Sequence, residues 1–180
     1  MLNKKIYFVL LLTVTLSNVR AQKLVSEKGL ITFLSHATIE DIKADNTKAS
    51  ALFYPANTNI AFSVPVNEFH FAKSLMQEHF NDKYLETELY PNSTFQGKLT
   101  GYDPAVDKEQ HVVAKGKLTM HGVTKDVEIP GTTEKLENKL VMKSTFIVKL
   151  QDYKIQIPQL LWQNIAEQVE VTINFTFKQQ

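Results

Sequence analysis

Apolar and polar residues alternate through most of this chain, and the alternation is cleanest near its C-terminal end. From Val169 to Phe177 every second residue is apolar, and polar residues such as Thr172 stand between them. Side chains on a β-strand point alternately to its two faces, so this pattern predicts a strand with one buried and one wet face. Strands of this kind close into a barrel or stack as a sandwich.

The same reasoning predicts eight strands in all. They are expected over residues 30–37, 47–54, 60–66, 95–99, 112–120, 123–130, 140–150 and 168–177. Pro65 lacks an amide hydrogen, which indicates the end or the edge of the third strand. The acidic segment 40–45 is expected to form a helical turn between the first two strands.

His121 and Gly122 predict a two-residue hairpin turn between the fifth and sixth strands, because such turns need residues that tolerate positive φ. A turn of this length sets the register of the two strands. It pairs Met120 with Val123, Gly116 with Val127, and Ala114 with Ile129. All six residues then share one face, so the predicted register agrees with the apolar pattern.

The spacing of apolar residues changes to a helical one over residues 72–88. Met76, Phe80 and Tyr84 recur at every fourth position, with charged residues between them. Asn81 and Asp82 are expected to divide this segment into two short helices. The helical segment could form a lid whose apolar side chains face the inside of a barrel, or it could simply plug one end.

Eight antiparallel strands with one helical insertion between the third and fourth predict an all-β fold, an eight-stranded antiparallel up-and-down barrel. A sandwich is the alternative. A barrel of eight strands can be filled by its own side chains or can hold one small ligand.

The first 21 residues have the layout of a secretory signal peptide. Lys4 and Lys5 precede an apolar run over residues 6–16, and Ala21 offers a small residue before Gln22. The run is shorter than the roughly 20 residues needed to span a bilayer. We therefore expect residues 22–180 to form one exported domain, either periplasmic or extracellular.

Composition narrows the classes of function. The chain has no cysteine, so it contains neither a disulfide framework nor a cysteine for a lipid anchor. Removing Lys4, Lys5 and Arg20 from the 20 basic residues leaves 17 against 19 acidic residues, a net charge near −2. Nucleic-acid binding requires a strong and clustered positive charge, so it is not expected.

Three segments carry a resemblance to a known family. They are LMQEHFNDKYLE at 75–86, YPNSTFQG at 90–97 and GKLTMHGVTK at 116–125. In this order, and with Asp152-Tyr153-Lys154-Ile155 near the end, they resemble the YceI-like family of exported bacterial proteins. The resemblance implies an extended lipocalin-like barrel that binds a polyisoprenoid chain in an apolar lumen and has no catalytic activity.

One part of the chain departs from the family pattern. Family members usually carry a longer first hairpin with a "G.F" motif, and residues 35–41 and 47–53 lack it. The departure leaves the width of the lumen and the identity of the ligand open.

The candidate ligand-binding residues combine the inward faces of the strands, the helical segment and one lysine. They are Phe62, Val64, Met76, Phe80, Tyr84, Phe95, Gly97, Gly116, Leu118, Lys125, Phe146, Val148, Ile173 and Phe175. Gly97 and Gly116 would remove volume from the lumen, or else mark bends of the sheet. Lys125 would meet an anionic head group, or lay its stem on apolar surface with its charge in water.

Other chemistry finds little support in the sequence. The five histidines have no metal-ligand spacing, and no catalytic motif is present, so no cofactor, metal or catalytic residue is expected. Two alternatives to lipid binding stay open: a packed barrel that binds another cell-envelope protein, and a hydrolase with a site at the barrel mouth. Transient membrane contact and a homodimer also stay open.

Overall fold

The computed structural model describes residues 23–36, 41–156 and 166–180. The predicted signal peptide, residues 1–21, lies outside the described residues. Among the described residues, no helix is long and apolar enough to cross a membrane.

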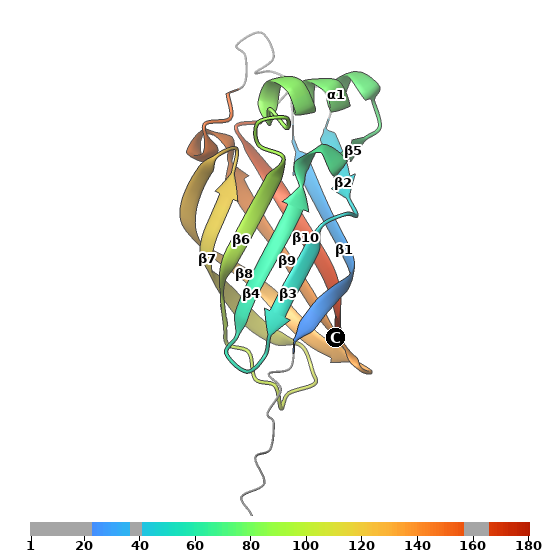
Figure 1. The fold of residues 1–180 in the computed structure, drawn as a ribbon, viewed down its shortest axis with the longest axis vertical. Helices are drawn as coiled ribbons and strands as arrows, with labels where there is room; N and C mark the ends of the chain where they lie inside the picture. Colours follow the sequence, from blue (N-terminus) through green and yellow to red (C-terminus); the bar gives the residue numbers. More distant parts are fainter. Residues whose placement is uncertain (1–22, 37–40, 157–165) are drawn as a thin grey trace, which may run out of the picture.

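The fold is a closed eight-stranded antiparallel barrel with one short helical insertion, as predicted (Figure 1). Its strands are β1 (Leu24–Ser35), β3 (Ser50–Tyr54), β4 (Asn59–Pro65), β6 (Asn92–Thr100), β7 (Gln110–Met120), β8 (Val123–Leu136), β9 (Lys139–Lys149) and β10 (Gln168–Gln179). Each pairs antiparallel with its neighbour, and pairing between β1 and β10 completes the ring.

Two positions in the eight-stranded ring are each occupied by two short strands in place of one continuous strand. β2 (Ile42–Asn46) and β3 both pair with β1, and the Asn46 side chain accepts hydrogen bonds from the amides of Lys48 and Ala49 where the two separate. β4 ends at Pro65, as predicted, and the chain continues through the 3-10 helix Val66–Glu68 into β5 (His70–Phe71), which pairs with β2.

The hairpin register is confirmed. Met120 pairs with Val123, and both turn residues have positive φ, 49° at His121 and 70° at Gly122. Gly116 faces Val127 and Ala114 faces Ile129, as expected.

Several predicted boundaries are wrong. β1 begins at Leu24 because a bulge between Ser26 and Lys28 hides its alternation from the sequence pattern. The acidic segment 40–45 was expected to be helical, but its described part lies largely in β2, where Asp45 accepts a hydrogen bond from Thr32. The second strand begins at Ser50 instead of 47. The sixth passes through Pro130 and ends at Leu136.

The helical insertion also differs from its prediction. α1 (Ser74–His79) is followed directly by one π-helical turn, Phe80–Tyr84, so the hydrogen-bond pattern changes at Phe80 and the segment is not broken at Asn81. The insertion lies across one end of the barrel (Figure 1).

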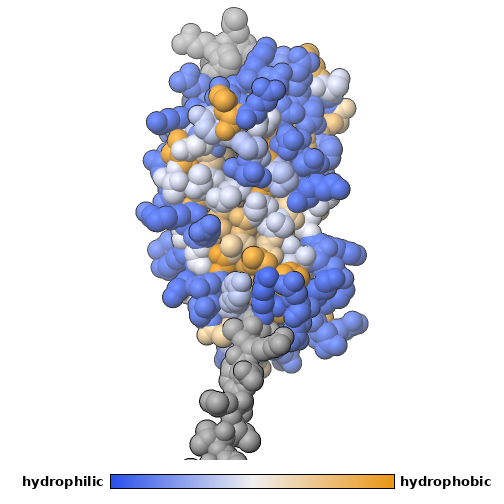
Figure 2. Space-filling model, in the orientation of Figure 1, coloured by the Kyte–Doolittle hydropathy of each residue, from blue (hydrophilic) through white to orange (hydrophobic). Residues whose placement is uncertain are grey.

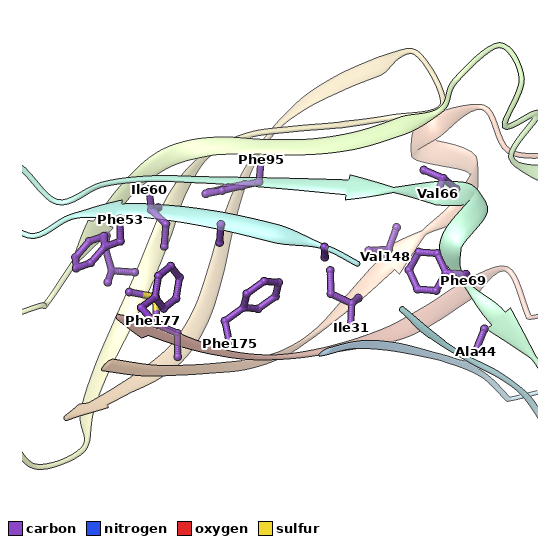
Figure 3. Close-up of a cluster of buried hydrophobic side chains, with 14 of the residues drawn as sticks. Ile31, Ala44, Phe53, Ile60, Val66, Phe69, Phe95, Val148, Phe175 and Phe177 are labelled. Carbon is purple, nitrogen blue, oxygen red and sulfur yellow. The ribbon is translucent and has the colours of Figure 1, made fainter. Parts of the chain in front are cut away.

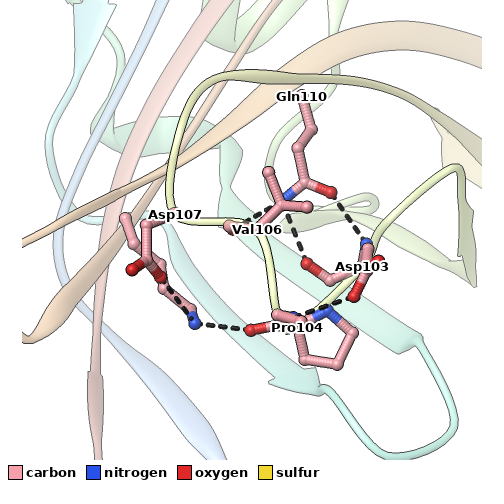
Figure 4. A network of polar contacts seen from close by, with 7 residues as sticks. Asp103, Pro104, Val106, Asp107 and Gln110 are labelled. Carbon is pink, nitrogen blue, oxygen red and sulfur yellow. Dashed lines mark hydrogen bonds and ion pairs between the residues drawn. The ribbon is translucent and has the colours of Figure 1, made fainter.

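The loop between β6 and β7 lies at the opposite end of the barrel (Figure 1), and Figure 4 shows its polar contacts. The Gln110 side chain bonds backbone groups of Asp103 and Val106, at distances of 2.8 to 3.1 Å. Lys135 donates to the carbonyl of Pro104 at 2.6 Å and pairs with Asp107 at 3.0 Å. These contacts fasten the loop to β8.

The apolar residues of the alternation turn inward. Figure 3 shows Phe53 and Phe177 in one part of the interior and Val66 and Phe69 in another. The outer face in Figure 2 is mostly hydrophilic, with apolar residues gathered in a band across its lower half. Burial of the inward apolar side chains is the main source of stability in a chain without disulfides.

Candidate functional site

The interior of the barrel is hollow. A cavity of about 460 Å³ lies between the inward faces of the strands and the helical insertion. This volume falls within the range of about 300–1,000 Å³ typical of small-molecule sites. Ten of the candidate residues line it: Phe62, Val64, Met76, Phe80, Tyr84, Phe95, Leu118, Phe146, Val148 and Ile173.

Aromatic rings form the floor of this cavity. Phe175 does not line it but is fully buried just below, with its ring centroid 5.0 Å from that of Phe62. Phe177 follows at 6.2 Å, and Phe53 packs against Tyr102 at 5.1 Å near the loop end. The barrel is therefore packed solid at the loop end and hollow toward the helical insertion.

Of the two roles considered for Gly97 and Gly116, the one that places them in the lumen wall to remove volume is wrong. These residues pair with each other, and neither lines the cavity. A Cβ at Gly97 would lie 2.3 Å from the carbonyl oxygen of Lys115, and one at Gly116 would lie 2.2 Å from that of Gln96. The two glycines therefore permit close approach of β6 and β7 backbones, and they do not enlarge the lumen.

Lys125 also lies outside the cavity. It pairs with Leu118, which does line the cavity, and alternation places it on the same side of β8 as Val127 and Ile129. Its side chain is nevertheless exposed. Lys125 stands close to the His121–Gly122 turn, at the mouth of the barrel, where its ammonium group can reach water.

A lid closes the helical end of the cavity. Phe80 packs in an aromatic cluster with Phe33, Phe69 and Phe71, at centroid distances of 4.9 to 5.7 Å. The Gln77 side chain donates to the carbonyl of Phe69 at 2.6 Å and accepts from the amide of Phe71 at 3.2 Å. The lid, residues 74–84, is therefore fastened to the barrel rim along one side.

The lining is almost entirely apolar. Among the described residues that line the cavity, only Ser35, His79, Tyr84, Ser93 and Thr94 carry polar side-chain atoms, and none is Asp, Glu, Lys or Arg. Desolvation by burial raises the pKa of the Tyr84 hydroxyl, which keeps that group neutral near pH 7. A charged group inside would find no counterion, so the cavity suits a neutral apolar ligand.

Several lining residues were missed by the sequence reasoning. Val169 and Val171 continue the alternation that includes Ile173, and Ile31 and Phe33 belong to the same face of β1. Their alternation was visible in the sequence and could have identified them. Phe69 and Phe71 lie outside any long alternating run, so no periodic signal was available for them.

Metal binding has no site in the described part of the chain. No group of three or more His, Asp or Glu side chains there is placed to hold a metal ion.

Comparison with known proteins agrees with this geometry. The sequence model of the YceI-like domain matches residues 20–177, which is most of the chain. The chain belongs to the YceI-like family. No curated protein sequence matches it at a significant level.

Solved structures of YceI-like and related proteins share the fold at low sequence identity. A polyisoprenoid binding domain from Saccharophagus degradans, implicated in plant cell wall breakdown, superposes with a TM-score of 0.75 at 15% identity, covering 87% of this chain and 98% of that one. BcnA from Burkholderia cenocepacia gives 0.70 at 15% identity, covering 82% and 95%. The YCEI protein of Campylobacter jejuni gives 0.61 at 18% identity, covering 81% and 88%.

A histidine connects the lid to the barrel in this YceI-like chain. His121 Nε2 lies 2.8 Å from a carboxylate oxygen of Glu86, just beyond the lid, and Nδ1 lies 3.1 Å from the carbonyl oxygen of Tyr153. The His121 side chain is 10% exposed. The sequence explained this residue by its turn alone, and its contact with Glu86 was not foreseen.

Substituting His121→Asn should loosen the lid while keeping the turn, because Asn tolerates positive φ but is too short to reach both partners. We expect the free energy of unfolding to fall by about 1–2 kcal/mol and amide hydrogen exchange over residues 80–90 to accelerate. Urea titration and exchange mass spectrometry measure these effects. The exposed His70→Asn is the control, and equal behaviour of the two variants would contradict this role.

Proposed function

We propose that this protein binds the hydrocarbon part of an amphiphilic lipid, most consistently a polyisoprenoid, in the barrel lumen and performs no catalysis on it. The observation that carries the proposal is the apolar cavity of about 460 Å³ between the Phe175 floor and the lid. The name of the Saccharophagus degradans neighbour supports the choice of a polyisoprenoid.

The energetics favour such a ligand. Each methylene group moved from water to an apolar site contributes roughly 0.8 kcal/mol. Ten buried methylenes would then contribute about 8 kcal/mol, against an association cost on the order of 4 kcal/mol or more. A cavity of this size would therefore retain a chain without any strong polar contact.

The lining argues against the alternatives named from sequence. A barrel acting only as a packed interaction module would not need an apolar hollow, which forfeits dispersion contacts. Hydrolysis requires a general acid or base near the substrate. Among the lining residues that the structure describes, His79 and Tyr84 are the titratable groups, and no carboxylate stands beside them in the lining.

Filling the lumen tests the proposal. Ala114 lines the cavity, so Ala114→Phe should occupy part of its volume and weaken binding of the isoprenoid alcohol farnesol at least tenfold, about 1.4 kcal/mol. Native mass spectrometry of gently purified protein should also show less co-purified lipid. Val113→Phe, on the outer face of the same strand, is the control. Equal affinity in both variants would contradict binding in the lumen.

We also propose that the protein is exported and acts in the periplasm or outside the cell, where lipid would have to be carried through water. Residues 1–21 carry the signal-peptide pattern on which this rests. Mass spectrometry of the mature protein should find its N-terminus within two residues of Gln22. A mature protein that retains Met1 and the apolar run would contradict export by cleavage.

A further inference from the structure

The barrel wall is incomplete between β8 and β9. Their ladder joins Leu136–Lys139 through Thr132–Lys143 and ends there. β8 nevertheless extends back to Val123 and β9 extends on to Lys149. Beyond this point β8 pairs only with β7, and β9 only with β10.

Pro130 explains where the ladder stops. The established register would next pair Gly131 with Ser144 and then Pro130 with Thr145. The carbonyl of Pro130 points toward β9, because it accepts a hydrogen bond from Ser144 Oγ at 2.5 Å. The amide and carbonyl of one strand residue point to the same neighbour, so proline removes a backbone donor on the side that faces β9.

A groove of about 450 Å³ lies on the outer surface at this split. Most of its lining residues, such as Thr132 and Lys143, face outward from β7 to β10. It also reaches Ser144, on the inner side of β9, and Ile173, whose side chain lines the central cavity. Ile129 and Phe146, on either side of the split, line the central cavity as well. Ile173 therefore lies between the groove and the lumen, and we call the unpaired stretch of β8 and β9 beside it the side window.

The rim of this window is polar and lacks acidic groups. Its described polar side chains are His111, Thr132, Lys143, Ser144, Thr145, Thr172 and Asn174. Lys143 is exposed and stands between Thr132 and Asn174 in the register. No ion pair of Lys143 occurs within the parts of the chain that the structure describes.

We propose that the window holds the anionic head group of the bound lipid, a phosphate or carboxylate, on the outer surface beside Lys143. The hydrocarbon chain passes between Ile129 and Phe146 and extends from the Phe175 floor toward the lid. This inference rests on the proposed function, because it requires a chain in the lumen. It reconciles an uncharged cavity with an amphiphilic ligand: the charged end stays in water.

Charge reversal at the rim tests the head group. The wild-type protein should bind farnesyl phosphate more tightly than farnesol by about fivefold or more, as measured by calorimetry. Lys143→Glu should abolish this preference and leave farnesol affinity unchanged. The matched control is Lys149→Glu, on the same face of β9 but outside the groove, and it should keep the preference.

Thiol footprinting locates the head group independently, because the chain has no native cysteine. Farnesyl phosphate should slow maleimide modification of Thr145→Cys several-fold and leave Lys149→Cys unaffected. Leu75→Cys reports on the lid end, where Leu75 lines the cavity and is 60% exposed. Protection at position 75 instead of 145 would place the head group at the lid and overturn the window.

The remaining outcomes separate the two proposals. If neither farnesol nor farnesyl phosphate binds, the proposed function itself fails. If both bind equally and Lys143→Glu changes neither affinity, the lumen proposal stands and the window proposal is overturned. If inorganic phosphate alone protects Thr145→Cys as well as farnesyl phosphate does, the groove is a site for free anions and not for a lipid head group.

Discussion

The pairing of β1 with β10 is the constraint on which the rest of this structure depends. These strands are the first and last of the chain, and the ladder between them runs from Leu24–Gln179 to Leu34–Glu170. It turns a sheet with two edges into a ring. Every inward side chain then faces the same enclosed space. The sizes of these side chains decide whether the space is filled.

The inward side chains differ in size along the barrel. Phenylalanines at positions 53, 175 and 177 are fully buried and fill the loop end. Toward the lid, Phe33 and Phe80 stack against each other at the rim, and branched aliphatic side chains such as Ile173 cover the walls without meeting across the centre. An apolar hollow of this kind costs dispersion energy in the free protein, and an apolar ligand would restore it.

The split between β8 and β9 is the second feature that sets this barrel apart from a sealed container. Barrels normally remove unpaired strand edges, because such edges invite association with other chains. Here β8 and β9 keep short unpaired edges, and polar residues surround them. Lys115 pairs with Glu128 and Lys117 with Asp126 on the adjoining outer face, which adds charge beside the edge. These charges protect the unpaired edges against association with other chains.

Much of this architecture could be predicted from the sequence, for identifiable reasons. The strand pattern of β7 to β10 and the hairpin at His121–Gly122 follow from alternation and turn chemistry, both of which are local. The bulge in β1 and the strand character of residues 42–46 could not be predicted, because they depend on pairing with distant strands.

The site was predictable to a similar extent. Residues in clean alternation, such as Phe62 and Phe146, line the cavity as expected. Gly97 and Gly116 do not line it. They allow the backbones of β6 and β7 to approach closely, and this approach depends on the pairing of the two strands, which the alternation does not show. The end of the β8–β9 ladder could not be predicted either. The sequence shows that Pro130 lacks a backbone donor, but it does not show whether the missing donor faces β7 or β9.

The most direct test of the central claim is an isotope-filtered NOE spectrum of methyl-labelled protein with unlabelled farnesol. If the chain occupies the lumen, intermolecular NOEs should connect it to the inward methyl groups of Ile31, Ile129 and Val148. Ile147, next to Val148 but facing outward and 53% exposed, should show none. NOEs to Ile147 without NOEs to the inward methyls would place the ligand on the outer surface and contradict the account.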